Sequence, residues 1–253
     1  MIIQIYEIQT PAEAAIMIEL GVDHIGSVIV SEADWKIPEI KETLDAVRPS
    51  SAKSSLIPLF NTLDSVLCTL DYYQPDIVHF CEALTDHQDI RAYCRQLTAL
   101  QQAVKKRFPQ IKIMRSIPIA QSGVDISIPT LELSRKFEPY SDFFLTDTML
   151  ANQSGTVDDN QPVRGFVGIT GQTCNWGMAA SLVAASRIPV ILAGGVSPAN
   201  VSEGMRRVRP AGVDSCTLTN AIDEEGHPVR FKKDVVKVKQ LIDAVRALET
   251  VGF

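Results

Sequence analysis

Short apolar runs rich in β-branched residues alternate along the chain with segments that have the spacing of amphipathic helices. The predicted strands are residues 2–6, 24–30, 55–60, 76–80, 111–117, 142–146, 189–193 and 212–216. Strands separated by helices are typical of parallel β-α units. Eight such strands in 253 residues favour a closed α/β fold, the (β/α)8 TIM barrel, over an open doubly wound sheet. We expect residues 1–253 to form a single domain.

Helix-starting signals lie between the strands. Thr10 is a predicted N-cap, Pro11 occupies the first helical position, and the helix is expected to end near Gly21. Further helices are predicted from residue 38 and over residues 63–72, 86–106 and 129–137. After the seventh strand, Ser197 followed by Pro198 predicts another N-cap and first helical position.

Composition narrows the function classes. The chain is 45% apolar and 21% charged, which fits one large core. It has 24 Lys and Arg against 30 Asp and Glu, a net charge of -6, so electrostatics give no reason to expect nucleic acid or a membrane as a partner. The first residues lack a secretion signal, and no apolar run reaches the length of a membrane span. We expect a cytoplasmic protein.

The five cysteines form no CxxC pair, and their odd number fits a reducing compartment. The equal spacing of Cys68, Cys81 and Cys94 raises the possibility of a metal site, but the four histidines are scattered and none is at ligand spacing to them. Buried thiols explain these cysteines better. We predict neither a metal nor a cofactor.

Two adjacent glycines follow the predicted seventh strand. Gly194 and Gly195 allow a sharp backbone turn that exposes amide groups. In TIM barrels, ligands bind at the loops after the carboxyl ends of the strands, and phosphate often binds near strands seven and eight. We therefore predict that a small phosphorylated ligand binds here. The alternative is that the glycines only permit a tight turn.

The order of motifs resembles that of the phosphoribosylanthranilate isomerase family, over nearly the whole chain. The matching segments are residues 3–5, 10–15, 20–26, 144–148, 170–176, 192–201 and 209–215. The last three segments, taken in series, are the most specific. The resemblance implies an Amadori rearrangement of an aminoaldose to an aminoketose, in tryptophan biosynthesis, by one general acid and one general base.

The resemblance places the acid at Asp147, at the end of the predicted sixth strand. The alternative is that Asp147 caps the next segment. The family's base is not retained, because Tyr6 stands at the position of its strand-one cysteine. Glu7 is the nearest carboxylate, and His79 is a candidate base that the family lacks at this position. Tyr6 is interpreted chiefly as a pocket wall or hydrogen-bond donor.

The substrate-binding positions are altered as well. The family's arginine, which the resemblance assigns to the anthranilate carboxylate, aligns with Asp34, so Lys36 or Arg115 is a candidate replacement. The alternative for Arg115 is an ion pair inside the barrel mouth. After strand eight a leucine replaces the family's glycine, and the hydroxyls of Thr217 and Thr219 are the predicted phosphate donors.

Gly171 lies in a glycine-containing loop after strand six that suits a lid.

The first hypothesis is an aldose-ketose isomerase acting on a phosphorylated sugar or aminosugar. The alternative is an inactive barrel that binds a phosphorylated metabolite as a sensor. Schiff-base chemistry is disfavoured, because Lys112 lies inside strand five and no lysine ends a strand. Barrels of this kind are often homodimers, but no sequence pattern identifies an interface.

Overall fold

Eight parallel strands close into a barrel in sequence order, with β8 pairing back to β1. The computed structural model describes residues 1–85, 88–124, 126–150, 163–250 and 252. The barrel strands are β1 (Ile2–Ile5), β2 (His24–Ile29), β3 (Lys53–Pro58), β4 (Ile77–Phe80), β5 (Lys112–Ala120), β6 (Phe143–Met149), β7 (Val190–Leu192) and β8 (Gly212–Ser215). The predicted TIM barrel is thereby confirmed. β5 and β6 each end three residues later than predicted, because they remain paired up to Ala120 and Met149.

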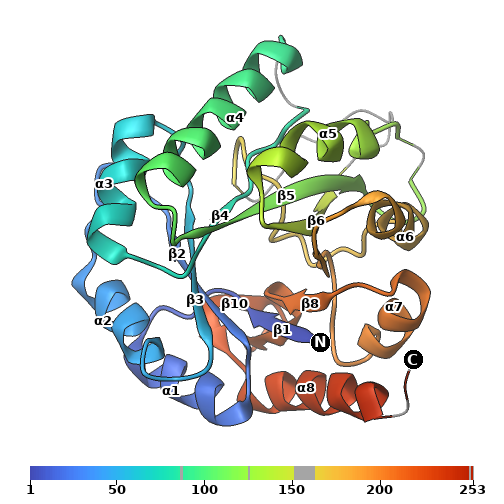
Figure 1. The fold of residues 1–253 in the computed structure, drawn as a ribbon. Helices are drawn as coiled ribbons and strands as arrows, with labels where there is room; N and C mark the ends of the chain where they lie inside the picture. Colours follow the sequence, from blue (N-terminus) through green and yellow to red (C-terminus); the bar gives the residue numbers. More distant parts are fainter. Residues whose placement is uncertain (86–87, 125, 151–162, 251, 253) are drawn as a thin grey trace.

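The helices surround the barrel (Figure 1). They are α1 (Pro11–Leu20), α2 (Pro38–Val47), α3 (Leu63–Tyr73), α4 (Ile90–Arg107), α5 (Thr130–Phe137), α6 (Trp176–Ala185), α7 (Val201–Val208) and α8 (Val235–Thr250), with a short 3-10 helix η1 (Glu138–Tyr140) after α5. The predicted cap of α1 is confirmed, since the Thr10 hydroxyl accepts from the Glu13 amide at 3.2 Å. None of the described helices is both long and apolar enough to span a membrane.

The start of α7 differs from the prediction. Ser197 is not an N-cap, because its amide donates to Asn200 Oδ1 at 2.8 Å, and its carbonyl accepts from the Asn200 and Val201 amides. Asn200 Nδ2 also donates to the Gly195 carbonyl at 2.8 Å. Residues 197–200 therefore form a turn, and the helix begins only after it, with Asn200 at the cap.

A hairpin between β8 and α8 was not predicted. After β8 the chain forms a short 3-10 helix, η2 (Thr217–Thr219), and two antiparallel strands, β9 (Asn220–Ile222) and β10 (Pro228–Lys233). The hairpin strands show little apolar alternation, which is why the sequence pattern did not reveal them. The hairpin supplies Arg230 and Lys233 to the carboxyl-terminal end of the barrel, as described below.

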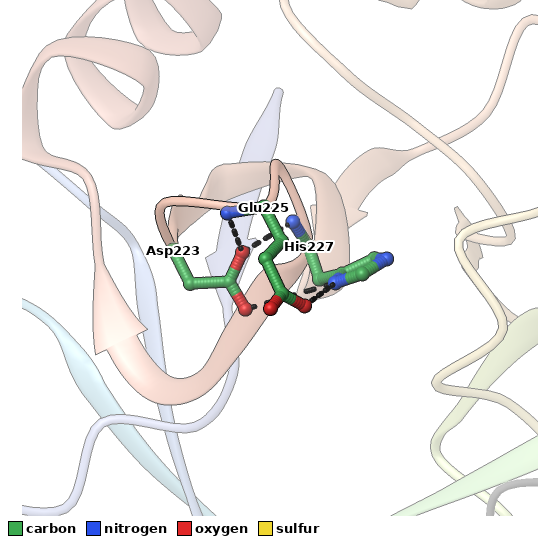
Figure 2. Close-up of side chains that lie close together, drawn as sticks. All are labelled: Asp223, Glu225 and His227. Carbon is green, nitrogen blue, oxygen red and sulfur yellow. Dashed lines mark hydrogen bonds and ion pairs between the residues drawn. The ribbon is translucent and has the colours of Figure 1, made fainter.

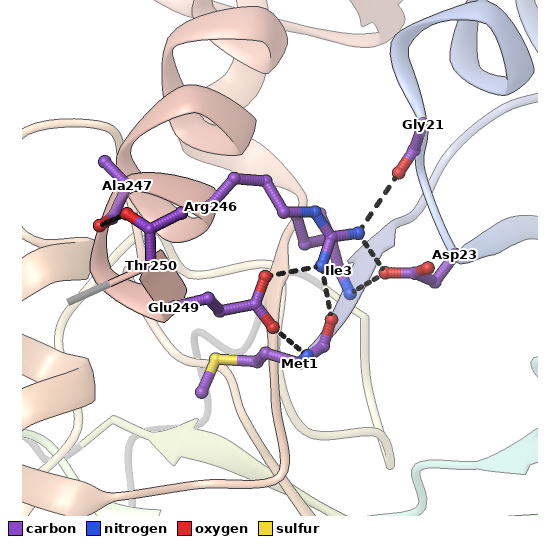
Figure 3. A network of polar contacts seen from close by, with 8 residues as sticks. All are labelled: Met1, Ile3, Gly21, Asp23, Arg246, Ala247, Glu249 and Thr250. Carbon is purple, nitrogen blue, oxygen red and sulfur yellow. Dashed lines mark hydrogen bonds and ion pairs between the residues drawn. The ribbon is translucent and has the colours of Figure 1, made fainter. Parts of the chain in front are cut away.

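The amino-terminal end of the barrel is closed by contacts between the two ends of the chain (Figure 3). Arg246 of α8 donates to Asp23 at 2.9 Å and to the Met1 carbonyl at 2.8 Å. Glu249 pairs with the terminal amino group. Because β1 must pair with β8 to close the barrel, these contacts stabilise closure. This end therefore has a structural role, and ligand sites of TIM barrels lie at the opposite end.

The barrel interior changes from apolar to polar along its axis. Near the amino-terminal end, Ile77, Met114, Leu145 and Ile191 pack together. Nearer the carboxyl ends, the inward positions carry polar groups that are almost fully buried; they include Gln4, Ser55, His79, Ser116 and Asp214. Buried polar groups are costly unless hydrogen-bonded, so this layer marks the functional end of the barrel.

Candidate active site

A cavity opens at the carboxyl ends of the strands. Its walls combine a few acidic and aromatic groups with apolar side chains and glycine backbone. The lining residues include Tyr6, Glu7, His79, Asp147, Gly171, Gly194, Gly195, Asp214, Thr217 and Leu218. An apolar cavity with a few converging polar groups, at this end of a barrel, is the expected form of a ligand site.

Asp147 lies in β6 with its carboxylate toward the cavity. Its Oδ1 accepts from the Thr148 amide at 3.1 Å, and its Oδ2 accepts from Ser116 Oγ at 3.3 Å. Gly168 lies directly against this carboxylate, because an added Cβ there would be 2.5 Å from it. Part of Asp147 remains accessible, yet burial raises its pKa to about 7 against two hydrogen bonds that lower it. Such a carboxyl donates a proton near neutrality.

Asp214 is a second cavity carboxyl, and sequence reasoning did not single it out. It lies in β8, is 6% exposed, and accepts from Gln4 Nε2 at 3.1 Å. Burial raises its pKa to about 7, with the charge of Asp147 adding to the rise. The signal in the sequence was an aspartate at an inward-facing position of a buried strand, where burying an unpaired charge costs free energy.

Tyr6 and His79 both line the cavity and contact each other. The Tyr6 hydroxyl lies 2.6 Å from Ser55 Oγ and 2.9 Å from His79 Nδ1. Burial raises the pKa of Tyr6 well above its ordinary value. Burial, together with the charge of Arg115, lowers the pKa of His79 to about 3. Both side chains are therefore neutral near pH 7, and neither is a strong base by itself.

Glu7 also lines the cavity, from the loop after β1, with a left-handed backbone (φ 64). Arg230 Nε donates to its Oε1 at 2.7 Å. Burial raises the pKa of Glu7, but the charges of Arg230 and Lys233 outweigh it and hold the pKa below its ordinary value. Glu7 is thus a stabilised carboxylate. A proton taken up there would disrupt an ion pair, which makes it a weak base.

The predicted phosphate loops converge on one side of the cavity. Gly194 and Gly195 both have left-handed φ values, 82 and 65, and an added Cβ on Gly195 would lie 2.6 Å from the Gln172 backbone. Gly171 lies near Thr217, since an added Cβ would be 3.3 Å from Thr217 Cγ2. The loops after β6, β7 and β8 therefore meet with backbone exposed, and backbone amides at such turns bind anions.

Two predicted ligand-binding residues lie elsewhere. The Thr219 hydroxyl donates to the Cys216 carbonyl at 3.0 Å, and its side chain is fully buried outside the cavity. Arg115 points from β5 toward the helices, is 0% exposed, and pairs with Glu82. The reason is strand alternation: Ser116 faces the barrel interior, so Arg115 faces outward. The alternative interpretation was an ion pair inside the barrel mouth; the structure has an ion pair with Glu82, but on the outer face of β5.

The segment just before the predicted lid position lines the cavity. The Val167 amide donates to the Cys81 carbonyl at 2.8 Å, and the Ala83 amide donates to the Gly165 carbonyl at 2.9 Å. This segment therefore joins the chain that follows β4, and it contributes Phe166 and Val167 to the cavity wall. Apolar walls of this kind lower the local dielectric, which strengthens the electrostatic interactions of the polar groups beside them.

The three equally spaced cysteines do not form a metal cluster among the described residues. The group there with metal-like proximity is Asp223, Glu225 and His227, whose ligand atoms lie within 4.8 Å of one another (Figure 2). All three are exposed, at the turn of the β9–β10 hairpin. Asp223 Oδ1 already accepts from the Glu225 and His227 amides, so the group stabilises a turn and we assign no metal to it.

The fold and this cavity define a TIM-barrel protein with a ligand site at the carboxyl ends of its strands. The family profile described as N-(5'phosphoribosyl)anthranilate (PRA) isomerase matches residues 121–244. This match covers just under half of the chain, which is similar to the phosphoribosylanthranilate isomerase family over that segment.

Relatives of this chain include proteins named N-(5'-phosphoribosyl)anthranilate isomerase. The one from Methanocella arvoryzae is 29% identical over 56% of this chain and 54% of its own length. The chain thus spans about half of that relative. The one from Methanosarcina acetivorans is 26% identical over 96% of this chain and 92% of its own length. The solved phosphoribosyl anthranilate isomerase from Thermotoga maritima has a TM-score of 0.64 at 17% identity, over 98% of this chain and 100% of that one.

Proposed function

We propose that this protein is an aldose-ketose isomerase that performs an Amadori rearrangement on an N-substituted 5-phosphoribosylamine, with phosphoribosylanthranilate as the first candidate. One observation carries the proposal: Asp147 is a carboxyl with a pKa raised to about 7, and it lines the same cavity as the converging glycine loops. The relatives named above are all named isomerases, which favours an enzyme over a sensor.

The proposed chemistry follows from the layout of the cavity. Backbone amides around Gly171, Gly194 and Gly195, with the Thr217 hydroxyl, hold the phosphate. Asp147 then protonates the ring oxygen of the aminoaldose, which opens the ring and leaves an iminium ion. Loss of the C2 proton gives an enolamine, which tautomerises to the aminoketose. A neutral carboxyl in a low-dielectric site is suited to the first step.

The test is the decay of phosphoribosylanthranilate fluorescence with purified protein. We expect turnover by the wild type and a loss of about 100-fold or more in kcat for Asp147→Asn, because a general acid contributes ~10²–10⁴-fold. Binding of reduced 1-(o-carboxyphenylamino)-1-deoxyribulose 5-phosphate, a compound bound in one solved isomerase structure, serves as the folding control for the variant. An Asp147→Asn variant with wild-type kcat would contradict the assignment of the acid.

We further propose that residues 1–253 form one domain and that the protein is a homodimer. The first proposal is supported by the closed barrel, and the second by the name of a solved Thermotoga maritima structure, which describes that enzyme as dimeric. Light scattering coupled to size exclusion measures the mass directly. A mass near that of one 27.8 kDa chain would contradict the dimer.

A further inference from the structure

A continuous row of hydrogen-bonding side chains crosses the barrel interior from Asp147 to Tyr6. Ser116 Oγ lies 3.3 Å from Asp147 Oδ2 and 2.8 Å from His79 Nε2. On the other side of the ring, His79 Nδ1 lies 2.9 Å from the Tyr6 hydroxyl. Ser116, His79 and Tyr6 are 0%, 2% and 3% exposed. The row therefore connects the proposed acid to the cavity wall opposite it without passing through bulk water.

The row has a defined direction once Asp147 has lost its proton. The Asp147 carboxylate only accepts hydrogen bonds, so Ser116 must donate to it. Ser116 then accepts from His79, which requires the hydrogen of the neutral ring to be on Nε2. Nδ1 is left to accept from the Tyr6 hydroxyl. Every link thus donates toward Asp147, which is the arrangement that carries a proton from Tyr6 to Asp147.

Tyr6 is held in this position from two sides. Its ring lies against Gly26, where an added Cβ would be 2.1 Å from Tyr6 Cδ1. Its hydroxyl contacts Ser55 Oγ at 2.6 Å. The phenol oxygen therefore stays at the cavity wall and in line with His79. Fixed geometry of this kind is what proton transfer between side chains requires.

We propose that Tyr6, His79, Ser116 and Asp147 form a proton relay in which Tyr6 is the base and Asp147 the acid of the isomerisation. This inference rests on the proposed function. Tyr6 and Asp147 are the catalytic residues that meet the substrate, whereas Ser116 and His79 transmit the proton between them. The relay also explains how a neutral tyrosine acts as a base: it accepts one proton only as it passes another to His79.

The proton balance of one turnover is as follows. Asp147 gives its proton to the ring oxygen as the ring C–O bond breaks. The electron pair of the C2–H bond then forms the C1–C2 double bond, and the iminium nitrogen takes the π pair. The C2 proton goes to the Tyr6 oxygen, the phenolic proton to His79 Nδ1, the Nε2 proton to Ser116, and the Ser116 proton to Asp147. His79 is left as the other tautomer and is reset by exchange with solvent when product leaves.

The test separates proton transfer from simple hydrogen bonding. In His79→Gln the amide can accept from Tyr6 and donate to Ser116, but it does not relay a proton. Ser116→Ala breaks the row, Ser116→Thr retains a hydroxyl, and Ser54→Ala is the matched control. Ser54 is a buried strand serine whose hydroxyl contacts Asp76 at 2.9 Å, away from the cavity. Each variant is assayed for turnover, for melting temperature and for binding of the reduced product analogue.

We expect His79→Gln and Ser116→Ala to lower kcat by about 100-fold at unchanged KM, and Ser54→Ala to stay near wild type. Ser116→Thr, which retains a hydroxyl, should lose less activity than Ser116→Ala. The wild-type rate in H2O–D2O mixtures should depend on deuterium fraction with the curvature of several protons in flight, and Ser116→Ala should show a linear dependence. Wild-type kcat in both His79→Gln and Ser116→Ala would overturn the relay while leaving the proposed function intact. Absence of wild-type turnover would overturn the proposed function and the relay with it.

A measurement without substrate covers the case in which a variant fails to fold. Nitrogen-15 NMR of the wild type reports the tautomer of each histidine, and it is recorded well above pH 7, where Asp147 is ionised. The His79 signals are identified from the spectrum of a folded His79 variant or by their protection from solvent. A neutral ring with hydrogen on Nε2 supports the relay. Hydrogen on Nδ1, or on both nitrogens, would overturn it.

Discussion

Arg230 Nε donates to Glu7 Oε1 across 2.7 Å, which ties the hairpin after β8 to the residue that follows β1. The other carboxylate oxygen accepts from Asn220 Nδ2 and from the Phe231 amide, each at 3.3 Å. Glu7 and Phe231 both have left-handed backbones, with φ values of 64 and 60. An uncommon backbone geometry at two contacting residues is maintained only when the surroundings require it. The hairpin therefore fixes the loop that carries Tyr6.

Removing the cation of this pair should destabilise the fold. Arg230→Met leaves the Glu7 carboxylate buried without its partner, and we expect a loss of about 1–3 kcal/mol in the free energy of unfolding. This is below the ~3–5 kcal/mol of a fully buried pair, because solvent screens the exposed third of Arg230. Glu7→Gln combined with Arg230→Met should recover much of the loss. Urea denaturation at pH 7 measures it, and an unchanged midpoint for Arg230→Met would contradict this role.

Asp214 should make the protein less stable as the pH rises. Its pKa is about 7 in the folded protein and near 4 when unfolded, so the folded state holds more protons between these values. Stability therefore falls by up to about 1.4 kcal/mol per pH unit from this group across that window. Asp214→Asn should unfold at a higher temperature than wild type at pH 8 and at a similar temperature below pH 4. The same difference at both pH values would show that ionisation of Asp214 is not the cause.

The barrel could be predicted from sequence because each parallel strand is an apolar run and many helices start at readable signals. The Thr10 cap and the Pro11 start of α1 are local patterns of a few residues. Gly194 and Gly195 could be located for the same reason, since they follow β7 directly. These features depend on neighbouring residues along the chain, which is the information that a single sequence contains.

The polar network could not be predicted, because it depends on contacts between distant strands. Ser116 meets His79 only because β4 and β5 are in a particular register. Arg115 was wrongly assigned to the ligand because the sequence did not fix which face of β5 points inward. Arg230 was missed because its hairpin lacks apolar alternation and its partner, Glu7, is 223 residues away. In each case the missing information was how segments distant in the sequence are placed against one another in the fold.

The activity should fall on the alkaline side of neutrality. Asp147 must be protonated to act as an acid, and its pKa is raised to about 7. We expect kcat/KM to be constant below this value and to fall about tenfold per pH unit above it, as the carboxyl of the free enzyme ionises. A pH series with constant ionic strength measures this dependence. A fall centred near pH 4 would contradict the raised pKa in the free protein.

The glycine loop can be tested by its response to phosphate esters. Gly195→Ala places a Cβ 2.6 Å from the Gln172 backbone, so the loops after β6 and β7 must separate. We expect it to abolish the thermal stabilisation given by ribose 5-phosphate. Gly123→Ala is the matched control, because Gly123 also has a left-handed φ, 79, but its added Cβ meets nothing within 4 Å. Equal loss in both variants would point to backbone strain rather than to a phosphate site.

The last prediction concerns the arylamine carboxylate of the candidate substrate. No Lys or Arg is found among the described residues that line the cavity, and residues 151–162 contain neither. A carboxylate in the cavity would thus lack a cation partner and be near Asp147 and Asp214.

We therefore expect the reduced anilino analogue, made from aniline and ribose 5-phosphate, to bind at least as tightly as its o-carboxy counterpart. Isothermal titration of both compounds measures the difference. In Leu59→Arg, which adds a cation to the cavity wall, the preference should shift toward the carboxy compound. Binding of the carboxy compound to the wild type at least about tenfold more tightly, equivalent to ~1.4 kcal/mol, would show that a cation reaches the cavity when ligand is bound.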